Sequence, residues 1–167
     1  MTATGVHGAP IIHEHHERLA RNVDRIPATA DLIGQADAAK MSAALEQTCT
    51  FLSDLLVPHM DAAERAVYPE LERLFQNKHA MTPMRREHAQ IRASIRDVDE
   101  IRVKAIAGPL TMTQQMRLRR ALFGVYALLK IHLAEELLYA DIIEAGATPE
   151  KEEALAAAMA HAGTASF

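Results

Sequence analysis

The sequence has few aromatic residues and a single cysteine. Aromatics make up 4% of its 167 residues, tryptophan is absent, and Cys49 has no second cysteine with which to form an internal disulfide. No uninterrupted apolar run approaches the roughly 20 residues that span a membrane. The N-terminal segment MTATGVHGAP has neither the basic start nor the apolar centre of a secretory signal. We therefore expect a soluble, cytoplasmic protein in which Cys49 is an inert thiol at an apolar helical position.

An excess of positive charge is also missing. The chain has 18 Lys and Arg residues against 22 Asp and Glu residues, which gives a net charge of −4 when histidine is neutral. Such a protein has no general electrostatic field that attracts nucleic acid or an anionic membrane. The basic run MRLRR at 116–120 is most simply a solvent-exposed helix face. We expect neither nucleic acid nor membrane as a partner.

The residues that are present favour helices. Apolar residues are 49% of the sequence, Ala, Leu, Arg and Glu are abundant, and β-branched residues are scattered. Proline, glycine and capping residues divide the chain into four long helices and a short fifth one. The expected fold is all-α, a single domain over 1–167. It is an antiparallel up-down four-helix bundle over 10–145, with a C-terminal helix at 148–160. Pro27 is expected to end the first helix, and the segment 27–37 is expected to be a linker.

Polar residues lie on the apolar faces that these helices should bury. In the last long helix, apolar residues recur every three or four positions, and His132 and Glu136 occupy two positions of that series. Both side chains should therefore point into the bundle. The same spacing places one histidine on the inner face of each of the other three helices: His16, His59 and His88.

The second long helix contains two apolar series that are out of register by one residue. Pro58 lies where they join, and a proline-induced kink or a one-residue π-bulge there would absorb the extra residue. His59 and Glu64 would then both face the core, and position 63 would point away from it.

Inward histidines and carboxylates together indicate a metal site. Burying carboxylates among apolar helices costs several kcal/mol per charge unless cations compensate. Imidazole and carboxylate donors without thiolates suit iron, manganese or zinc, and sites of this kind in bundles typically hold two metals bridged by glutamate. The segment EHHERLARNVDRI at 14–26 is similar to REHAQIRASIRDV at 86–98, and HMDAAERAVYPEL at 59–71 is similar to HLAEELLYADII at 132–143. A pair of histidine-bearing helical segments therefore occurs twice, an arrangement suited to binding two metal ions.

The motifs EHHERL, HMDAAERAVYP, EHAQIR and HLAEE resemble those of the hemerythrin-like, or HHE cation-binding, domains over about residues 10–145. The resemblance implies an up-down bundle around a non-haem centre of two iron ions, with an oxo or hydroxo bridge and bridging carboxylates. It implies binding or sensing of O₂, NO, peroxide or iron. Carried over residue by residue, the ligands would be His16, His59, His88, His132 and Glu136.

The chain departs from the family pattern at two positions. Ala63 stands where a glutamate usually follows the second histidine, which leaves Glu64 as the candidate ligand. Met84 stands where relatives resembling invertebrate hemerythrin have a further histidine. Four side chains are candidates for extra ligands or nearby partners of the ligands: His15, Tyr68, Tyr139 and Met84 itself.

Three functions remain open from the sequence. A carrier or sensor of O₂ or NO needs an open metal position, which Met84 in place of histidine would leave. A peroxide-decomposing enzyme also needs groups that move protons, such as the tyrosines, Glu87 or Glu135. A metal-free helical interaction module is the third. We favour binding or sensing of a small diatomic or peroxide ligand, and a homodimer is left open.

Overall fold

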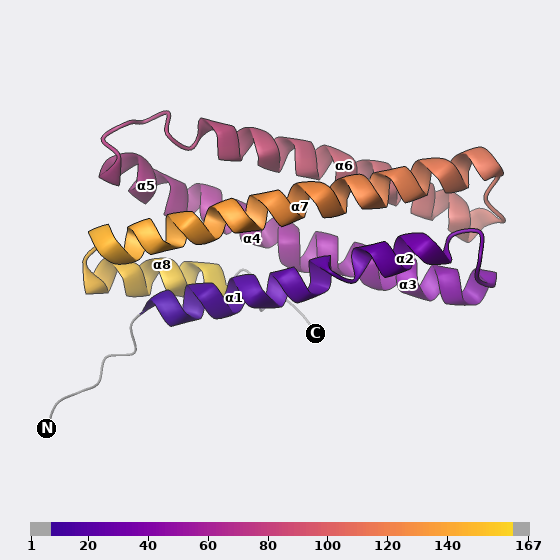
Figure 1. The fold of residues 1–167 in the computed structure, drawn as a ribbon, viewed down its shortest axis with the longest axis horizontal. Helices are drawn as coiled ribbons and strands as arrows, with labels where there is room; N and C mark the ends of the chain where they lie inside the picture. Colours follow the sequence, from indigo (N-terminus) through magenta and orange to yellow (C-terminus); the bar gives the residue numbers. More distant parts are fainter. Residues whose placement is uncertain (1–7, 162–167) are drawn as a thin grey trace, which may run out of the picture.

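The computed structural model describes the backbone of residues 8–161 and the side chains of residues 13–159. Over this part of the chain the protein is built from helices, which confirms the all-α prediction. Figure 1 shows their arrangement. The elements are α1 (Gly8–Val23), α2 (Ile26–Leu32), α3 (Ala38–Thr50), η1 (Phe51–Leu56), α4 (Val57–Ala62), η2 (Ala63–Val67), α5 (Tyr68–Leu74), α6 (Thr82–Ala107), α7 (Met112–Gly146) and α8 (Pro149–His161).

These elements form four long members and an additional helix. The segments α1 and α2 make the first member, the run from α3 to α5 the second, α6 the third and α7 the fourth. In Figure 1, α7 extends along the molecule between α6 on one side and α1 with α2 on the other, and it packs against all three. The predicted four-helix bundle with a C-terminal helix is confirmed.

The prediction of a linker over 27–37 was wrong for its first part, which forms α2, whereas residues 33–37 connect α2 to α3. A turn at residues 24–25 separates α1 from α2, and Pro27 lies in the first turn of α2. A proline is tolerated there because backbone N–H groups in the first turn have no partner within the helix. Thr29 and Ala30 are buried, and the Thr29 hydroxyl lies 2.9 Å from that of Thr48. The segment therefore belongs to the bundle.

A π-helical stretch, η1, lies directly before Pro58. The N–H of Val57 donates to the carbonyl of Leu52, five residues earlier. Pro58 has no N–H with which to continue an α-helical ladder, so the wider turn is accommodated just before it. The predicted π-bulge near Pro58 is confirmed.

A second π-helical stretch, η2, lies directly before Pro69 and was not predicted. Here the N–H of Tyr68 donates to the carbonyl of Ala63, again five residues earlier. Between the two stretches, α4 is a regular α-helix. His59 and Ala63 are four residues apart with only regular helix before Ala63, so they share one face, and the following shift brings Tyr68 onto that face as well.

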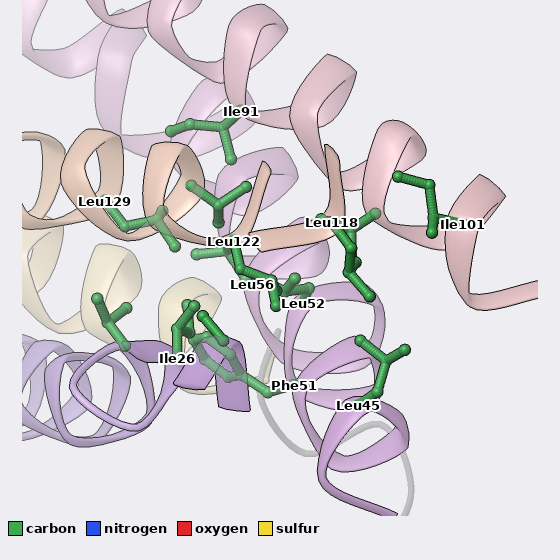
Figure 2. Packing of buried hydrophobic residues seen from close by; sticks show 14 of the residues in the cluster. Ile26, Leu45, Phe51, Leu52, Leu56, Ile91, Ile101, Leu118, Leu122 and Leu129 are labelled. Carbon is green, nitrogen blue, oxygen red and sulfur yellow. The ribbon is translucent and has the colours of Figure 1, made fainter. Parts of the chain in front are cut away.

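Two apolar clusters fill the interior. The larger cluster gathers residues from all four long members, and Figure 2 shows Ile26, Leu56, Ile91 and Leu122 within it. The smaller cluster contains side chains from η2, α5, α6, α7 and α8. Helix α8 packs along α1 and against η2 and α4, and it buries Leu155, Ala156 and Met159.

Cys49 lies half-buried on α3, beside the larger cluster. Burial raises the pKa of its thiol to about 11. The thiolate is the reactive form of cysteine, so a protonated thiol has low reactivity at neutral pH. This environment agrees with the expectation of an inert residue. None of the helices in the described part of the chain has the length and apolarity needed to cross a membrane.

Candidate metal centre

A single buried carboxylate lies at the centre of the bundle. Glu136 on α7 is 6% exposed. Its Oε2 atom lies 3.2 Å from Nε2 of His16 and 2.9 Å from Nε2 of His59. Its Oε1 atom lies 3.4 Å from Nε2 of His132 and 3.8 Å from Nε2 of His88. Each carboxylate oxygen therefore faces a different pair of imidazoles.

Four separate members contribute these side chains. His16 comes from α1, His59 from α4, His88 from α6, and His132 from α7, one turn before Glu136. All five residues were candidates from the sequence, and the structure brings them together. The ligand atoms of His16, His59 and Glu136 lie within 4.8 Å of one another, and so do those of His88, His132 and Glu136.

The chemistry of these donors fits metal ions. Imidazole nitrogens with a carboxylate and no thiolate suit iron, manganese or zinc. Burial acts to raise the pKa of Glu136, but the His59 and His132 imidazoles hold it well below its usual range. The carboxylate is therefore in its anionic, metal-binding form. The carboxylate of Glu136 directs one oxygen towards each pair of histidines. A carboxylate that bridges two ions needs this arrangement.

The outer nitrogens of three of the histidines have defined partners. Nδ1 of His88 lies 2.7 Å from Glu64, and Nδ1 of His132 lies 3.0 Å from Glu87. Nδ1 of His59 lies 3.0 Å from Nε2 of His15. Such contacts fix the orientation of the imidazole ring and determine which nitrogen carries the proton.

These outer partners follow the internal repeat. His15 directly precedes His16 on α1, and Glu87 directly precedes His88 on α6. Each of these residues contacts the histidine of a neighbouring helix, His59 and His132 respectively. The sequence pairs His-His and Glu-His were the signal for this role. Sequence reasoning listed His15 as a reserve ligand and Glu87 as a proton-moving group.

Glu64 does not join either group of metal-facing donors. Its carboxylate is on the Nδ1 side of His88 and also accepts a hydrogen bond of 2.9 Å from Arg92. The expectation that position 63 points away from the core was wrong, because Ala63 is 1% exposed and lines a cavity beside Glu136. The register shift was expected between His59 and Glu64, whereas the π stretches lie before and after this turn of α4.

Tyr68 is the tyrosine that contacts the centre. Its hydroxyl donates to Oε1 of Glu136 at 3.2 Å and lies 3.0 Å from Nε2 of His88. Burial and the nearby Glu136 carboxylate raise the pKa of this phenol, so it is protonated at neutral pH. Tyr139 lines the same cavity and packs edge-on against Phe75. Met84 is fully buried in the smaller apolar cluster.

A small cavity of about 20 Å³ adjoins the centre. Its polar wall includes His16, Glu136 and Tyr68, and its apolar wall includes Ala63 and Met159. A cavity of this volume has room for about one water-sized molecule. Met159 comes from α8, so the C-terminal helix contributes part of the wall of this cavity.

The metal-free protein should lose stability as the pH falls from about 6.5 to about 4. Burial and the nearby His59 lower the pKa of His15 to about 3, and burial and His132 lower that of His88 to about 4. The unfolded chain gains protons at these residues near pH 6.5 and the folded chain does not. Their contribution is therefore present above that pH and lost as the pH falls towards the folded values.

The raised pKa of His132 acts in the opposite direction and offsets part of this loss. The expected decrease in the free energy of unfolding is on the order of 3 kcal/mol. Denaturant unfolding with a chelator present, repeated across this pH range, measures it. His15→Gln should reduce the dependence of the free energy of unfolding on pH. A stability that stays constant on acidification would contradict the prediction.

Comparison with known protein families gives one match. The family model of the Hemerythrin HHE cation binding domain matches residues 7–143. This range includes all five residues of the buried centre and ends before α8. Searches of curated proteins and of solved structures give no significant match.

Proposed function

Because the chain belongs to the hemerythrin HHE cation-binding domain family, we propose that its buried centre holds two iron ions and uses them to bind or sense a small oxygen species. The family assignment and the two His and Glu groups support metal binding. The choice of iron, the number of ions and the ligand are the parts that we propose.

The donors divide equally between two positions. His16 and His59 with Oε2 of Glu136 would hold one ion, and His88 and His132 with Oε1 would hold the other. Two histidines and one carboxylate form a donor set typical of non-haem iron with open coordination positions. Bound iron supplies a redox-active centre to which small molecules can attach. Glu64 was a candidate metal ligand, and we assign it instead the role of orienting the His88 imidazole.

The cavity beside Glu136 is the observation that carries this proposal. Its volume of about 20 Å³, room for about one water-sized molecule, restricts a ligand beside Glu136 to a very small molecule and excludes a larger substrate. Val67, Ala140 and Ile143 give it an apolar wall, which admits small neutral molecules and limits bulk water. Binding or sensing of O₂, NO or peroxide is therefore the function that the site supports best.

Peroxide decomposition is the second candidate, and Tyr68 is the reason to retain it. Its protonated hydroxyl contacts both Glu136 and His88. In this position it can hold a proton next to a ligand in the cavity and donate a hydrogen bond to it. A Tyr68→Phe variant that keeps its iron but loses peroxide turnover would assign this role.

Metal analysis is the first test. Protein produced with adequate iron should contain close to two iron ions per chain, because two buried groups of donors are present. A content near zero that reconstitution does not raise would refute the metal site. It would then favour the metal-free helical interaction module.

The second test separates a sensor from an enzyme. O₂, NO and hydrogen peroxide are added separately to the reduced and the oxidised iron-loaded protein while the optical spectrum is recorded. A reversible change with O₂ or NO supports binding or sensing, and sustained release of O₂ from peroxide supports catalysis. If none of the three changes the spectrum, the proposal of a small oxygen ligand is wrong.

A further inference from the structure

The outward face of α7 carries an apolar stripe that no other helix covers within the described part of the chain. Half of the large hydrophobic side chains that are exposed in this part lie on it: Met116 at 55%, Phe123 at 40%, Ile131 at 59% and Leu138 at 65%. With the residues between them they follow steps of three and four, the spacing of one helix face. We call this stripe the outer seam, and it consists of Met116, Arg120, Phe123, Ala127, Ile131, Ala134 and Leu138.

The outer seam is symmetric about Ala127. Phe123 and Ile131 lie four residues on either side of it, and Met116 and Leu138 lie eleven residues on either side. When two identical helices pack antiparallel about a two-fold axis, positions equidistant from the axis meet. Large apolar residues would then lie opposite large apolar residues along about 33 Å of helix. The pattern is self-complementary in the antiparallel orientation.

We propose that the outer seam is the interface of a homodimer, in which α7 packs antiparallel against α7 of a second copy with Ala127 on the two-fold axis. Figure 1 shows that α7 extends along the whole bundle with α6 on one side and α1 and α2 on the other. The other three long members do not cover its outward face, because the buried residues of α7, such as Val125 and Leu129, lie on the opposite side. A second copy can therefore approach along the full seam.

Gly124 provides a separate reason for a close partner. It is exposed in the interior of α7, where glycine costs roughly 1 kcal/mol relative to alanine. A Cβ atom at this position would meet nothing within 4 Å, so the packing of the single chain does not require glycine. Close approach of a second helix does require a small residue.

The charges beside the outer seam favour the antiparallel orientation. Arg117 and Arg120 line the groove between α6 and α7 along the N-terminal half of the seam, and Glu135 lies on the same edge of the helix along its C-terminal half. A two-fold axis between antiparallel helices brings the α6 edges of the two copies together, so Glu135 of each copy lies near Arg117 and Arg120 of the other. A parallel register would instead place the arginines of the two copies against one another, which is unfavourable.

Cysteine crosslinking tests the register directly. In a Cys49→Ala background, Ala127→Cys should form a disulfide-linked dimer under mild oxidation, because position 127 meets itself on the axis. Phe123→Cys alone should not, because its two copies would be about 12 Å apart along the helices, beyond the reach of a disulfide. Mixing Phe123→Cys with Ile131→Cys should give the mixed dimer. Self-linkage of Phe123→Cys, or no linkage at Ala127→Cys, would overturn the proposal.

Sedimentation velocity over a wide range of protein concentration tests the interface without crosslinks. The native chain should dimerise, and Phe123→Glu should shift it to monomer with unchanged helix content, because this side chain is partly exposed in the single chain. Ile106→Glu is the matched control, since Ile106 is 65% exposed on α6 and lies outside the outer seam. A monomeric native chain at every concentration, or equal loss of dimer in both variants, would overturn the proposal. Neither experiment depends on metal content, so its result is separate from the proposed function.

Discussion

Glu136→Gln should abolish tight binding at both metal positions. The two oxygens of this carboxylate face the two pairs of histidines, so a single neutral amide removes an anionic donor from each position. The amide nitrogen would also present hydrogen atoms to one pair of imidazoles, where a metal ion needs a lone pair. Iron content should fall from close to two per chain to near zero.

Glu135→Gln is the matched control for this variant. Glu135 is the neighbouring residue on α7 and is not part of either group of donors. Its substitution should leave the iron content unchanged. Circular dichroism of both variants reports whether the bundle has formed. A folded Glu136→Gln protein that retained two ions would show that Glu136 does not bridge the centre.

Glu87→Gln should weaken metal binding at the His88 and His132 position by about 10–100-fold, the range typical for loss of a partner that orients a ligand. Glu87 lies 3.0 Å from Nδ1 of His132. Its negative charge favours the proton on Nδ1 and leaves Nε2 free for a metal ion. Binding at the other position should change little.

The two metal positions should also differ in their affinity for metal ions in the native protein. The Arg18 guanidinium lies 3.1 Å from Nδ1 of His15, and since arginine can only donate, this nitrogen must accept. The proton of a neutral His15 is then on Nε2, which lies against Nδ1 of His59. This chain of contacts favours the proton of His59 on Nε2, the nitrogen that faces Glu136. In the metal-free protein, the nitrogen of His59 that would bind a metal ion therefore carries a proton. The position formed by His16 and His59 should bind a metal ion less tightly for this reason.

Stepwise titration of metal-free protein with Co²⁺ measures both effects. The spectrum should show a tighter and a weaker step, and Glu87→Gln should weaken the tighter one. Glu64→Gln should have a smaller effect, because Arg92 already shares the charge of that carboxylate. Glu153→Gln, on the exposed surface of α8 and outside every group of possible metal-binding donors, serves as the control. If Glu87→Gln altered neither step, an orienting role for Glu87 would be excluded.

The inner face of α7 shows what the sequence could predict. His132 and Glu136 continue a regular apolar series with Leu129 and Ile143, and the structure buries all four. In a long, regular α-helix the periodicity of the apolar residues identifies the face that packs into the core. His16 and His88 were located by the same reasoning, because α1 and α6 are also regular through these positions.

The second member shows what the sequence left open. A register shift was visible from the apolar pattern, but its position was not, because a wider turn can form at any of several residues before a proline. The structure has two such turns. As a result Ala63 faces the centre and Glu64 contacts the outer nitrogen of His88, which is the reverse of the expectation. The hydroxyl of Tyr68 could not be placed for the same reason. Its contact with Glu136 depends on the second shift, and Pro69 was the local signal for it.

The distance between donors along the chain has a consequence for how the protein is made. His16 and Glu136 are 120 residues apart in sequence, although their side chains are 3.2 Å apart in space. During synthesis no complete centre can exist until the residues up to Glu136 have left the ribosome and α7 has joined α1. Metal ions therefore bind the finished bundle, and by mass action they stabilise it in proportion to their supply. In a cell short of metal, newly made chains would be less stable and more exposed to proteolysis, so the abundance of the protein would itself follow metal availability.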